Sequence, residues 1–437
     1  MAQIFRAKKT SNKGKVLTLN VKSLDHQGRG VANHNGKVCF IDGALPNEQV
    51  KAQILDEKSK LIEAKQVKVL TPSEERVAPF CQHYGVCGGC QLQHLEVNSQ
   101  ITYKQQAVSK LFEKFAKETH LAWQPVITSD DKHYRRSARI ACIADKKTKQ
   151  FKLGFRAQKS KQIVEVENCP VLNVAFTELF SRLRLAITDN VKLHSISHVQ
   201  LCEADNGVFV LIRHTKAIDD NTKQTLTTAL SDSGVQVLWD DGTTPVAYEQ
   251  LPNYRVDGIE FGFQLNNFIQ VNSEVNEKML MQSLDWLALN EQDIVLDLFC
   301  GIGNFSLLAA KHAKRVVGVE GVDSSVQRAK SNAAQNQLEN VSFECFDLKD
   351  DISSAKWFDK QANVLILDPS RTGAYDVLKQ LTLNQFEKIL YVSCDPVTLA
   401  RDSALVLEAG FTISKVGLMN MFPHTGHIET MALFQRR

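Results

Sequence analysis

One cysteine, Cys394, stands where a chain of this kind can present a reactive group. It follows the apolar run Ile389-Leu390, which is typical of a buried strand, and Pro396 ends that strand two residues after the cysteine. A thiol at this position would lie at the open end of a sheet, where doubly wound folds bind small molecules and substrates. The alternative is a structural cysteine, because cysteine also packs as a small apolar residue. On Cys394 alone the structural alternative is the stronger, so its interpretation depends on other residues.

A second group of cysteines indicates metal chemistry. Cys81, Cys87 and Cys90 occur within ten residues among several glycines, and Cys169, followed by Pro170, is a candidate fourth ligand. Cysteines this close in a reduced compartment favour a metal or cluster over disulfides. Structural zinc usually takes two close cysteine pairs, whereas a last ligand followed by proline is typical of ferredoxin-type clusters. We predict an iron–sulfur cluster; zinc and unligated thiols are the alternatives.

Length and composition are those of a folded protein with two to four domains. The chain has 437 residues, of which 43% are hydrophobic and 23% are charged. We find no secretory leader and no apolar run of membrane-spanning length, and ten scattered cysteines do not resemble a secreted disulfide framework. We therefore expect a cytoplasmic protein.

The positive charge is concentrated in two segments. Residues 1–80 contain 14 Lys and Arg against 8 Asp and Glu, and residues 132–161 contain 11 Lys and Arg against Asp145 alone. Since the net charge of the whole chain is only +3, the rest of the chain is net acidic. This distribution suggests that particular domains meet a polyanion. Solvated surface charge is the alternative.

The order of elements predicts a multi-domain α/β protein. After a basic arm over 1–14, short strands and turns over 15–74 predict an OB-like β-barrel, a fold that commonly binds RNA. Residues 75–265 are interpreted as a central α+β domain, including a helix over about 96–117 that could pack on the catalytic domain. Alternating strands and helices over 266–437 predict a Rossmann-like sheet with helices on both faces. Two strands at the C-terminal end, about 411–419 and 427–435, should be antiparallel because their connection is short.

A glycine turn in this last domain suits an adenosine cofactor. Gly301 and Gly303 follow a predicted strand, but Ser306 stands where the NAD fingerprint has a third small residue, normally glycine. Glu320, at the end of the next strand, is placed to bind ribose hydroxyls, and Asp347 could meet the adenine amino group. S-Adenosylmethionine needs no phosphate-binding glycine cluster because it carries no phosphates.

Four motifs make the resemblance specific. They are Asp-Pro-Ser-Arg-x-Gly from residue 368, Leu-Tyr-Val-Ser-Cys-x-Pro-x-Thr from 390, Met-Phe-Pro-His-Thr-Gly-His-Ile-Glu from 421 and Phe-Ile-Gln-Val-Asn from 268. Together they resemble the RNA uracil-C5 methyltransferase family over nearly the whole chain. The barrel resembles a TRAM domain, and the four cysteines resemble the family's [4Fe-4S] ligands. With both accessory features present, the chain resembles the branch that methylates 23S ribosomal RNA, free or in an early large subunit, with no obligate protein partner evident.

The resemblance implies a covalent mechanism. Uracil C5 is a poor nucleophile, so a thiolate adds to C6 and produces an enolate that can take the methyl group. Cys394 would be this nucleophile and Glu429 the base that removes the C5 proton. By the same resemblance, the cofactor would be held by Gln270, Phe299, Asn304, Glu320, Asp347 and Asp368. We further expect substrate RNA to meet Phe268, Arg135 and Arg136.

Two positions depart from the family pattern. Asp395 stands where asparagine is usual, and Asn420 where aspartate is usual. We hypothesise that the two side chains meet near the active site and that the exchange preserves one hydrogen bond. A carboxylate beside Cys394 would disfavour its thiolate if both faced one pocket.

Three other functions stay open. A related enzyme could methylate a tRNA. An RNA cytosine-C5 methyltransferase would also carry a cysteine after the fifth strand, but it generally has a second one after the fourth, which is missing at Asp368-Pro369-Ser370-Arg371. A catalytically silent RNA-binding or ribosome-assembly protein would not need the cofactor loop, Cys394 and Glu429.

Overall fold

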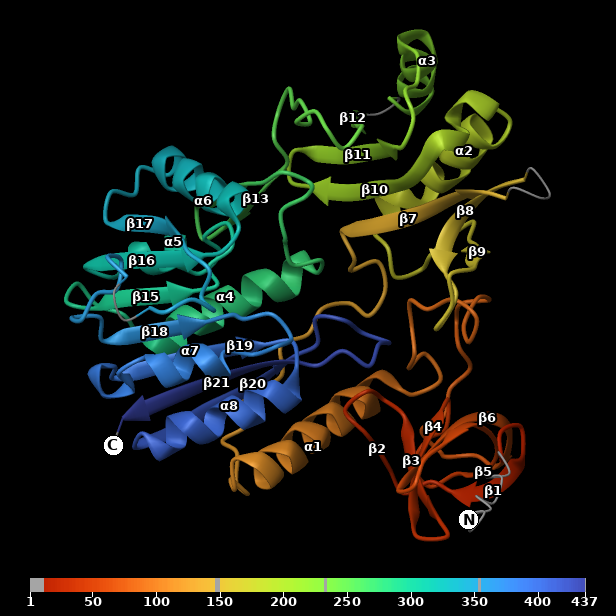
Figure 1. Ribbon diagram of the computed structural model, residues 1–437, viewed down its shortest axis with the longest axis horizontal. Coiled ribbons are helices and arrows are strands. Elements are labelled where there is room, and N and C mark those ends of the chain that lie inside the picture. Colours follow the sequence, from red (N-terminus) through yellow and green to blue (C-terminus); the bar gives the residue numbers. More distant parts are fainter. Residues whose placement is uncertain (1–11, 146–149, 232–233, 353–354, 437) are drawn as a thin grey trace, which may run out of the picture. The chain divides into compact units, whose positions relative to one another are not determined.

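The computed structural model describes residues 12–145, 150–231, 234–352 and 355–436 (Figure 1). Most of the predicted basic arm and the Lys146-Lys147-Thr148-Lys149 turn lie outside these ranges. The chain forms two compact units. Unit 1 comprises Met1–Gly85, Cys90–Ala107 and His424–His427, and unit 2 comprises Val86–Gly89, Val108–Pro423 and Ile428–Arg437. Within the described ranges, no helix is long and apolar enough to cross a membrane.

Unit 1 is built on a six-stranded sheet with the order β1-β5-β6-β4-β3-β2. The sheet curls so that β1 also contacts β3, and alternate residues such as Leu17 and Leu19 point into the core. This agrees with the predicted β-barrel, and within the described residues its sheet has six strands. The strands are β1 Val16–Asn20, β2 Ser23–Leu24, β3 Gly30–His34, β4 Lys37–Asp42, β5 Gln49–Glu57 and β6 Leu61–Thr71.

The first sheet of unit 2 has the order β12-β11-β10-β7-β8-β9. Apolar residues that alternate along β7, such as Ile140, pack under helices α2 and α3, so Arg139 lies on the other face. The predicted hairpin of β7 and β8 is confirmed by their antiparallel pairing. The elements are β7 Ser137–Ala144, β8 Phe151–Arg156, β9 Ile163–Glu165, η1 Val174–Phe176, α2 Thr177–Thr188, η2 Val191–Ser195, β10 Ile196–Ala204, β11 Gly207–His214, α3 Asp220–Leu230 and β12 Val235–Asp240.

The second sheet of unit 2 has the order β17-β16-β15-β18-β19-β21-β20. Neighbouring strands from β17 to β19 are parallel, and β21 runs antiparallel to both β19 and β20, as predicted for the last two strands. Helices pack on both faces, which makes this a Rossmann-like sheet (Figure 1). Its strands are β15 Ile294–Leu298, β16 Arg315–Glu320, β17 Val341–Cys345, β18 Val364–Leu367, β19 Lys388–Ser393, β20 Phe411–Met419 and β21 Glu429–Arg436.

Helices connect these strands. The helices are α4 Ser273–Leu287, α5 Ser306–Ala310, α6 Asp323–Gln335, α7 Tyr375–Gln380, η3 Leu383–Gln385 and α8 Pro396–Glu408. Helix α1, Val97–Phe115, begins in unit 1 and ends in unit 2, where Trp123 Nε1 donates a hydrogen bond to Ser109 Oγ at 3.2 Å. That contact fastens the second half of α1 to the segment leading into β7.

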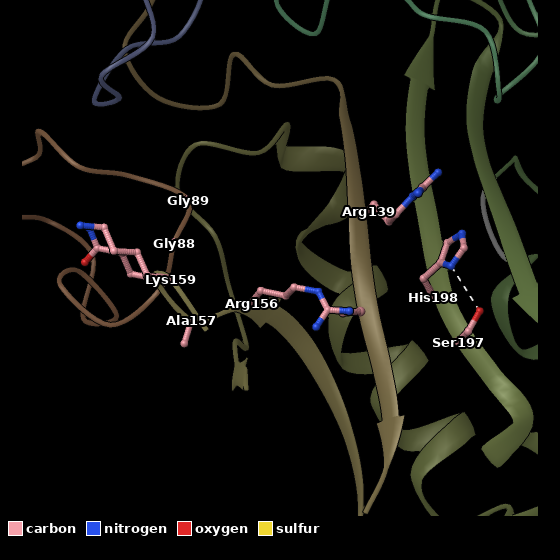
Figure 2. Close-up of a pocket in the computed structure, with 10 residues that line it drawn as sticks. Gly88, Gly89, Arg139, Arg156, Ala157, Lys159, Ser197 and His198 are labelled. Carbon is pink, nitrogen blue, oxygen red and sulfur yellow. Dashed lines mark hydrogen bonds between the residues drawn. The ribbon is translucent and has the colours of Figure 1, made fainter. Parts of the chain in front are cut away.

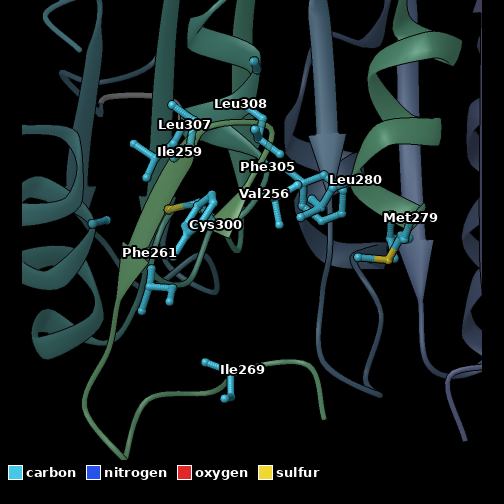
Figure 3. Close-up of a cluster of buried hydrophobic side chains, with 14 of the residues drawn as sticks. Val256, Ile259, Phe261, Ile269, Met279, Leu280, Cys300, Phe305, Leu307 and Leu308 are labelled. Carbon is cyan, nitrogen blue, oxygen red and sulfur yellow. The ribbon is translucent and has the colours of Figure 1, made fainter. Parts of the chain in front are cut away.

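One hydrophobic core crosses the predicted domain boundary at residue 265. The hairpin of β13 (Asn253–Val256) and β14 (Ile259–Gly262) packs its apolar residues against α4 and α5 (Figure 3). Cys300, from the glycine turn, and Ile269, from the segment before α4, belong to the same core. The core therefore fixes both segments that we expected to hold the cofactor.

Candidate active site

The predicted nucleophile and base come together at one edge of the Rossmann-like sheet. Strand β19 ends at Ser393, which pairs with Thr430 of β21. Continuing this antiparallel register by one residue places Cys394 opposite Glu429, the first residue of β21. Cys394 is half-buried and Glu429 is buried. Two residues 35 positions apart in the sequence are thus neighbours at the carboxyl end of β19.

The environment of Cys394 favours the protonated thiol. Burial raises the pKa of the Cys394 thiol to about 11, the charges of Glu429 and Asp368 act in the same direction, and Arg371 acts against them. At neutral pH the thiol therefore holds its proton. Asp368 and Glu429, rather than Asp395, are the carboxylates that disfavour the thiolate.

Asp395 has a structural role of its own. Its Oδ1 accepts hydrogen bonds from the backbone N–H groups of Val397 at 2.9 Å and Thr398 at 3.2 Å, so it caps α8. Aspartate and asparagine are equally good caps. Capping therefore explains why either residue suits this position, and the predicted pairing of Asp395 with Asn420 stays a prediction.

The glycine turn after β15 leaves room for a ligand. Phe299 and Gly301 both have left-handed backbones, with φ of 67° and 57°, and a Cβ added to Gly301 would meet nothing within 4 Å. Glu320, at the end of β16, accepts hydrogen bonds from Gly301 N at 3.3 Å and Val322 N at 2.9 Å. These bonds fix the Glu320 carboxylate beside the turn.

Two acids with raised pKa values lie at this edge, Asp297 buried and Asp368 half-buried. Asp297 is fully buried; its Oδ2 accepts a hydrogen bond from Ser306 Oγ at 2.5 Å, and among the described residues its Oδ1 has no partner. Burial raises the pKa of Asp297 to about 7, and burial also raises the pKa of Asp368 to about 7. An unpartnered buried carboxylate oxygen suits a cationic ligand. Sequence reasoning missed Asp297, although an acid inside the apolar run of β15 was a usable signal.

The other predicted cofactor residues differ in their surroundings. Gln270 is buried, and Asn304 is held by Tyr254, which donates to its Oδ1 at 2.7 Å, and by Asn276, which accepts from its Nδ2 at 3.0 Å. Asp347 is exposed, and its Oδ1 accepts a hydrogen bond from the backbone N–H two residues later at 3.0 Å. Asp347 therefore also stabilises its own turn.

The three predicted RNA residues differ in their exposure to solvent. Phe268 is 75% exposed, which is unusual for a phenylalanine and suits stacking on a base. Arg135 is half-buried, and its Nε donates to a backbone carbonyl. Against the prediction, Arg136 is only 1% exposed: it lies over the Tyr254 ring, and its Nε donates to the carbonyl of Gln270 at 2.9 Å. Arg136 thus positions Gln270 from inside the core rather than meeting RNA.

The loop after β18 is fixed by buried hydrogen bonds. Gly373 has φ of 77°, and a Cβ there would lie 2.5 Å from Asp402 Oδ2. The next backbone N–H, of Ala374, donates to Asp402 at 2.7 Å and to the Tyr391 hydroxyl at 3.0 Å. The same loop carries Arg371, an exposed residue whose charge lowers the pKa of Cys394, a role that sequence reasoning did not assign.

The four cysteines predicted to bind a cluster are all partly exposed and form no disulfide. The backbone N–H of Gly89 points at Cys87 Sγ at 3.5 Å, the kind of hydrogen bond that stabilises cluster sulfur. Within the described ranges, however, no three His, Cys, Asp or Glu side chains are gathered to hold a metal ion. The donor chemistry fits an iron–sulfur cluster, and the ligation itself stays a prediction.

Comparison with known families covers nearly the whole chain. The family model for tRNA (uracil-5-)-methyltransferase matches residues 96–437, and that for the TRAM domain matches residues 10–67. The second match covers the strands of unit 1 up to β6, and the first includes both sheets of unit 2.

Full-length relatives are close. The chain is 55% identical to the 23S rRNA (uracil(1939)-C(5))-methyltransferase RlmD of Pseudoalteromonas translucida and 43% identical to that of Vibrio cholerae, and in both cases the match covers 100% of each chain. Among solved structures, the Pyrococcus abyssi tRNA (uracil-54, C5)-methyltransferase in complex with S-adenosyl-L-homocysteine superposes with a TM-score of 0.73. That match has 23% identity and covers 96% of this chain and 100% of the other. This likeness shows a shared fold.

Proposed function

The chain belongs to the tRNA (uracil-5-)-methyltransferase family, and we propose that it methylates uracil C5 in 23S ribosomal RNA. The single observation that carries the chemistry is the pairing of Ser393 with Thr430, which brings the adjacent residues Cys394 and Glu429 to the same end of the sheet. The choice of ribosomal RNA rests on the two full-length relatives, which are named for that substrate, and on the TRAM match.

The reaction begins and ends at Cys394. Its thiolate attacks uracil C6, forming the C6–S bond and moving the electron pair of the C5–C6 bond onto C5 as an enolate. C5 then takes the methyl group of S-adenosylmethionine, and the remainder of the cofactor leaves as S-adenosylhomocysteine. Glu429 removes the remaining C5 proton, and the returning electron pair restores the C5–C6 double bond and expels the thiolate.

The high thiol pKa has a consequence for this scheme. Because burial, Glu429 and Asp368 raise the pKa of Cys394 to about 11, the thiol must pass its proton to water or to a neighbouring carboxylate before it attacks C6. Arg371 is the cation whose charge favours the thiolate. We therefore assign Arg371 to supporting the thiolate while C6 is attacked.

The acids at the sheet edge fit the methyl donor, which supplies an electrophilic methyl group on a sulfonium. Glu320 would bind its ribose hydroxyls, and Asp297 and Asp368 would meet its positive charges. Asp297 has a buried carboxylate oxygen without a partner among the described residues, and the half-buried Asp368 lies at the end of the neighbouring strand. Gln270, Phe299, Asn304 and Asp347 are the remaining residues proposed to hold this cofactor.

We propose further that Cys81, Cys87, Cys90 and Cys169 hold a [4Fe-4S] cluster. Their partial exposure, the lack of disulfides and the Gly89 N–H directed at Cys87 Sγ support this. Methyl transfer to an enolate consumes no electron, so we assign the cluster a structural role. Replacing Cys87 with serine should lower RNA affinity and solubility while S-adenosylmethionine still binds; lost activity with normal folding and RNA affinity would contradict that role.

The proposed function is tested by the identity of the labelled nucleoside. Protein purified without oxygen is given methyl-labelled S-adenosylmethionine and unmodified transcripts of 23S rRNA or tRNA, and the RNA is then digested. We expect label in 5-methyluridine from rRNA alone. Label in tRNA would overturn the substrate, label in 5-methylcytidine would overturn the base, and no label would support the silent RNA-binding protein.

A further inference from the structure

A cationic pocket of about 680 Å³ lies on unit 2, and its lining includes neither Cys394 and Glu429 nor any proposed cofactor residue (Figure 2). Its walls come from β7, β8, β10 and two short loops. The lining residues are Gly88, Gly89, Arg139, Ala141, Arg156, Ala157, Gln158, Lys159, Ser197 and His198. This set contains three cations, an imidazole, a hydroxyl and an amide, but no carboxylate and no large apolar side chain. Such a lining fits an anion rather than a base or an apolar ligand.

Strand alternation gathers these side chains on one face. His198 of β10 pairs with Ala141 of β7, so His198 and Arg139 project from the face of the sheet opposite α2 and α3. Arg156 ends β8, the strand on the other side of β7. In Figure 2 the Arg139 side chain lies close to His198, and Arg156 projects from the next strand.

Two arginines of this pocket have no carboxylate partner. Within the described ranges no carboxylate forms a salt bridge with Arg139 or Arg156, although Arg156 Nη1 donates to the Lys161 carbonyl at 3.1 Å, whereas the adjacent Arg213 is paired with Asp240 at 2.6 Å. The pKa of His198 lies below its ordinary value, first because of burial and then because of the charges of Arg139 and Arg213, with Asp240 acting weakly the other way. The charge of Arg139 thus reaches the His198 ring, although burial is the larger cause of the lowered pKa.

The loop that closes the pocket is fixed by backbone bonds. Gly88 N donates to Arg156 O at 3.0 Å, and Gln158 N donates to Val86 O at 2.9 Å. A Cβ added to Gly88 would lie 3.1 Å from the Arg156 carbonyl oxygen, so a side chain at this position would crowd the wall. The pocket is therefore a built feature of the fold rather than a gap between mobile side chains.

We propose that this pocket binds a phosphodiester of the substrate RNA, with Arg139 and Arg156 as the phosphate ligands. The inference rests on the proposed function, which supplies RNA as the polyanion. Arginine donors in fixed positions match phosphate oxygens. Ser197 Oγ lies 3.2 Å from His198 Nδ1 and donates to the Arg213 carbonyl at 3.3 Å, so it orders this wall of the pocket. The contact anchors the RNA at a distance from the reacting base and carries no base specificity.

The test measures RNA affinity as a function of salt, using the full-length protein with its cluster and a fluorescent 23S rRNA fragment. Arg139→Gln and Arg156→Gln should each weaken binding by roughly 3- to 10-fold near 0.1 M salt and lower the slope of log Kd against log salt by about 1. Arg139→Lys should keep the slope and recover part of the affinity. Lys216→Gln, an exposed lysine of the same unit outside the pocket, is the matched control for net charge.

Measurements of methyl transfer and of cofactor binding distinguish a lost RNA contact from a damaged active site. The kcat at saturating RNA and the Kd of S-adenosylmethionine should stay within about twofold of the parent protein, because the pocket is remote from the reacting atoms. Pocket variants that bind RNA like Lys216→Gln would overturn the inference. Binding of free uridine 5′-monophosphate is measured as well. Variants that lose this binding but keep the RNA affinity of the parent protein would also overturn the inference, because the pocket would then bind a free nucleotide and not the RNA backbone. A parent protein that neither binds nor methylates the fragment would overturn the proposed function as well.

Discussion

Two regions of unit 2 carry opposite charge and sit on different kinds of sheet. The active-site edge of the parallel sheet gathers Asp297, Asp368 and Glu429, all buried or half-buried, around Cys394. The pocket on the central sheet presents arginines without carboxylate partners within the described ranges. The first suits a cationic methyl donor and the second suits an anionic RNA backbone. In the proposed reaction, the acidic edge of the parallel sheet would bind the cationic methyl donor, and the cationic pocket on the other sheet of unit 2 would bind the RNA backbone.

The largest expected effect is on the acidic side, at Glu429. Glu429→Gln should lower the rate of 5-methyluridine formation by roughly 10²- to 10⁴-fold, because the C5 proton loses its base. The methylated RNA should stay attached to Cys394, so a covalent complex should accumulate on denaturing gels. Glu339→Gln, an exposed position of the same unit, is the control. A slow variant that forms no complex would assign Glu429 to an earlier step.

Arg136 and Arg139 sharpen the comparison, because they lie three residues apart in opposite environments. Arg136→Ala should reduce the free energy of unfolding by roughly 2–4 kcal/mol, since it leaves a cavity over Tyr254 and an unpaired Gln270 carbonyl. Arg139→Ala should change it by less than about 0.5 kcal/mol, as is usual at exposed positions. Denaturant titration measures both, and equal losses would contradict the buried role of Arg136.

Asp368 tests whether the acidic edge attracts the methyl donor. Asp368→Asn should raise the Kd of S-adenosylmethionine by roughly 10- to 100-fold, because a hydrogen bond to a charged group is lost. Asp376→Asn, at an exposed position of α7, should not. With the pKa of Asp368 near 7, affinity in the parent protein should weaken as pH falls below about 7, where the carboxylate is protonated. Calorimetry over pH checks this, and a flat pH profile would contradict it.

The alkylation rate of Cys394 depends on the charged residues at the same edge of the sheet. Alkylation of Cys394 should accelerate with pH up to about 11, since only the thiolate reacts. Glu429→Gln should speed alkylation at pH 8 and Arg371→Gln should slow it, each by roughly 3- to 10-fold, because a pKa shift of one unit is tenfold in thiolate. Peptide mapping distinguishes Cys394 from the other cysteines. The same direction in both variants would refute the assigned charges.

The smallest effect is expected at the cap of α8. Asp395→Ala should lower the free energy of unfolding by about 1 kcal/mol, whereas Asp395→Asn should be nearly neutral, because asparagine caps equally well. Both variants should keep the alkylation profile of Cys394. A shifted profile in Asp395→Asn would show that this carboxylate faces the thiol after all.

Part of the candidate active site was predictable from the sequence because parallel strands end at one edge. The βα pattern placed Cys394 at the end of a strand, whereas Glu429 entered only through the family resemblance, since no pattern indicates that β21 pairs with β19. Asp297 was missed because an acid inside a strand gives no contiguous motif.

The cationic pocket was not predictable for a different reason. Charge counting found the basic segment 132–161 but could not say which face of the sheet each residue takes. Arg136 precedes β7 and turns into the core, while Arg139 lies on the open face. His198 joins Arg139 only through the register of β10 with β7, which no local pattern encodes.

The most direct test of the central claim is to trap the covalent adduct. An rRNA fragment whose target uridine carries fluorine at C5 is incubated with S-adenosylmethionine, and the protein is digested for mass spectrometry. Because fluorine cannot leave as a proton does, the methylated base should stay bound to Cys394 in the parent protein and in Glu429→Gln, and Cys394→Ser should give no adduct. An adduct on another residue, or one that forms equally with Cys394→Ser, would contradict the mechanism.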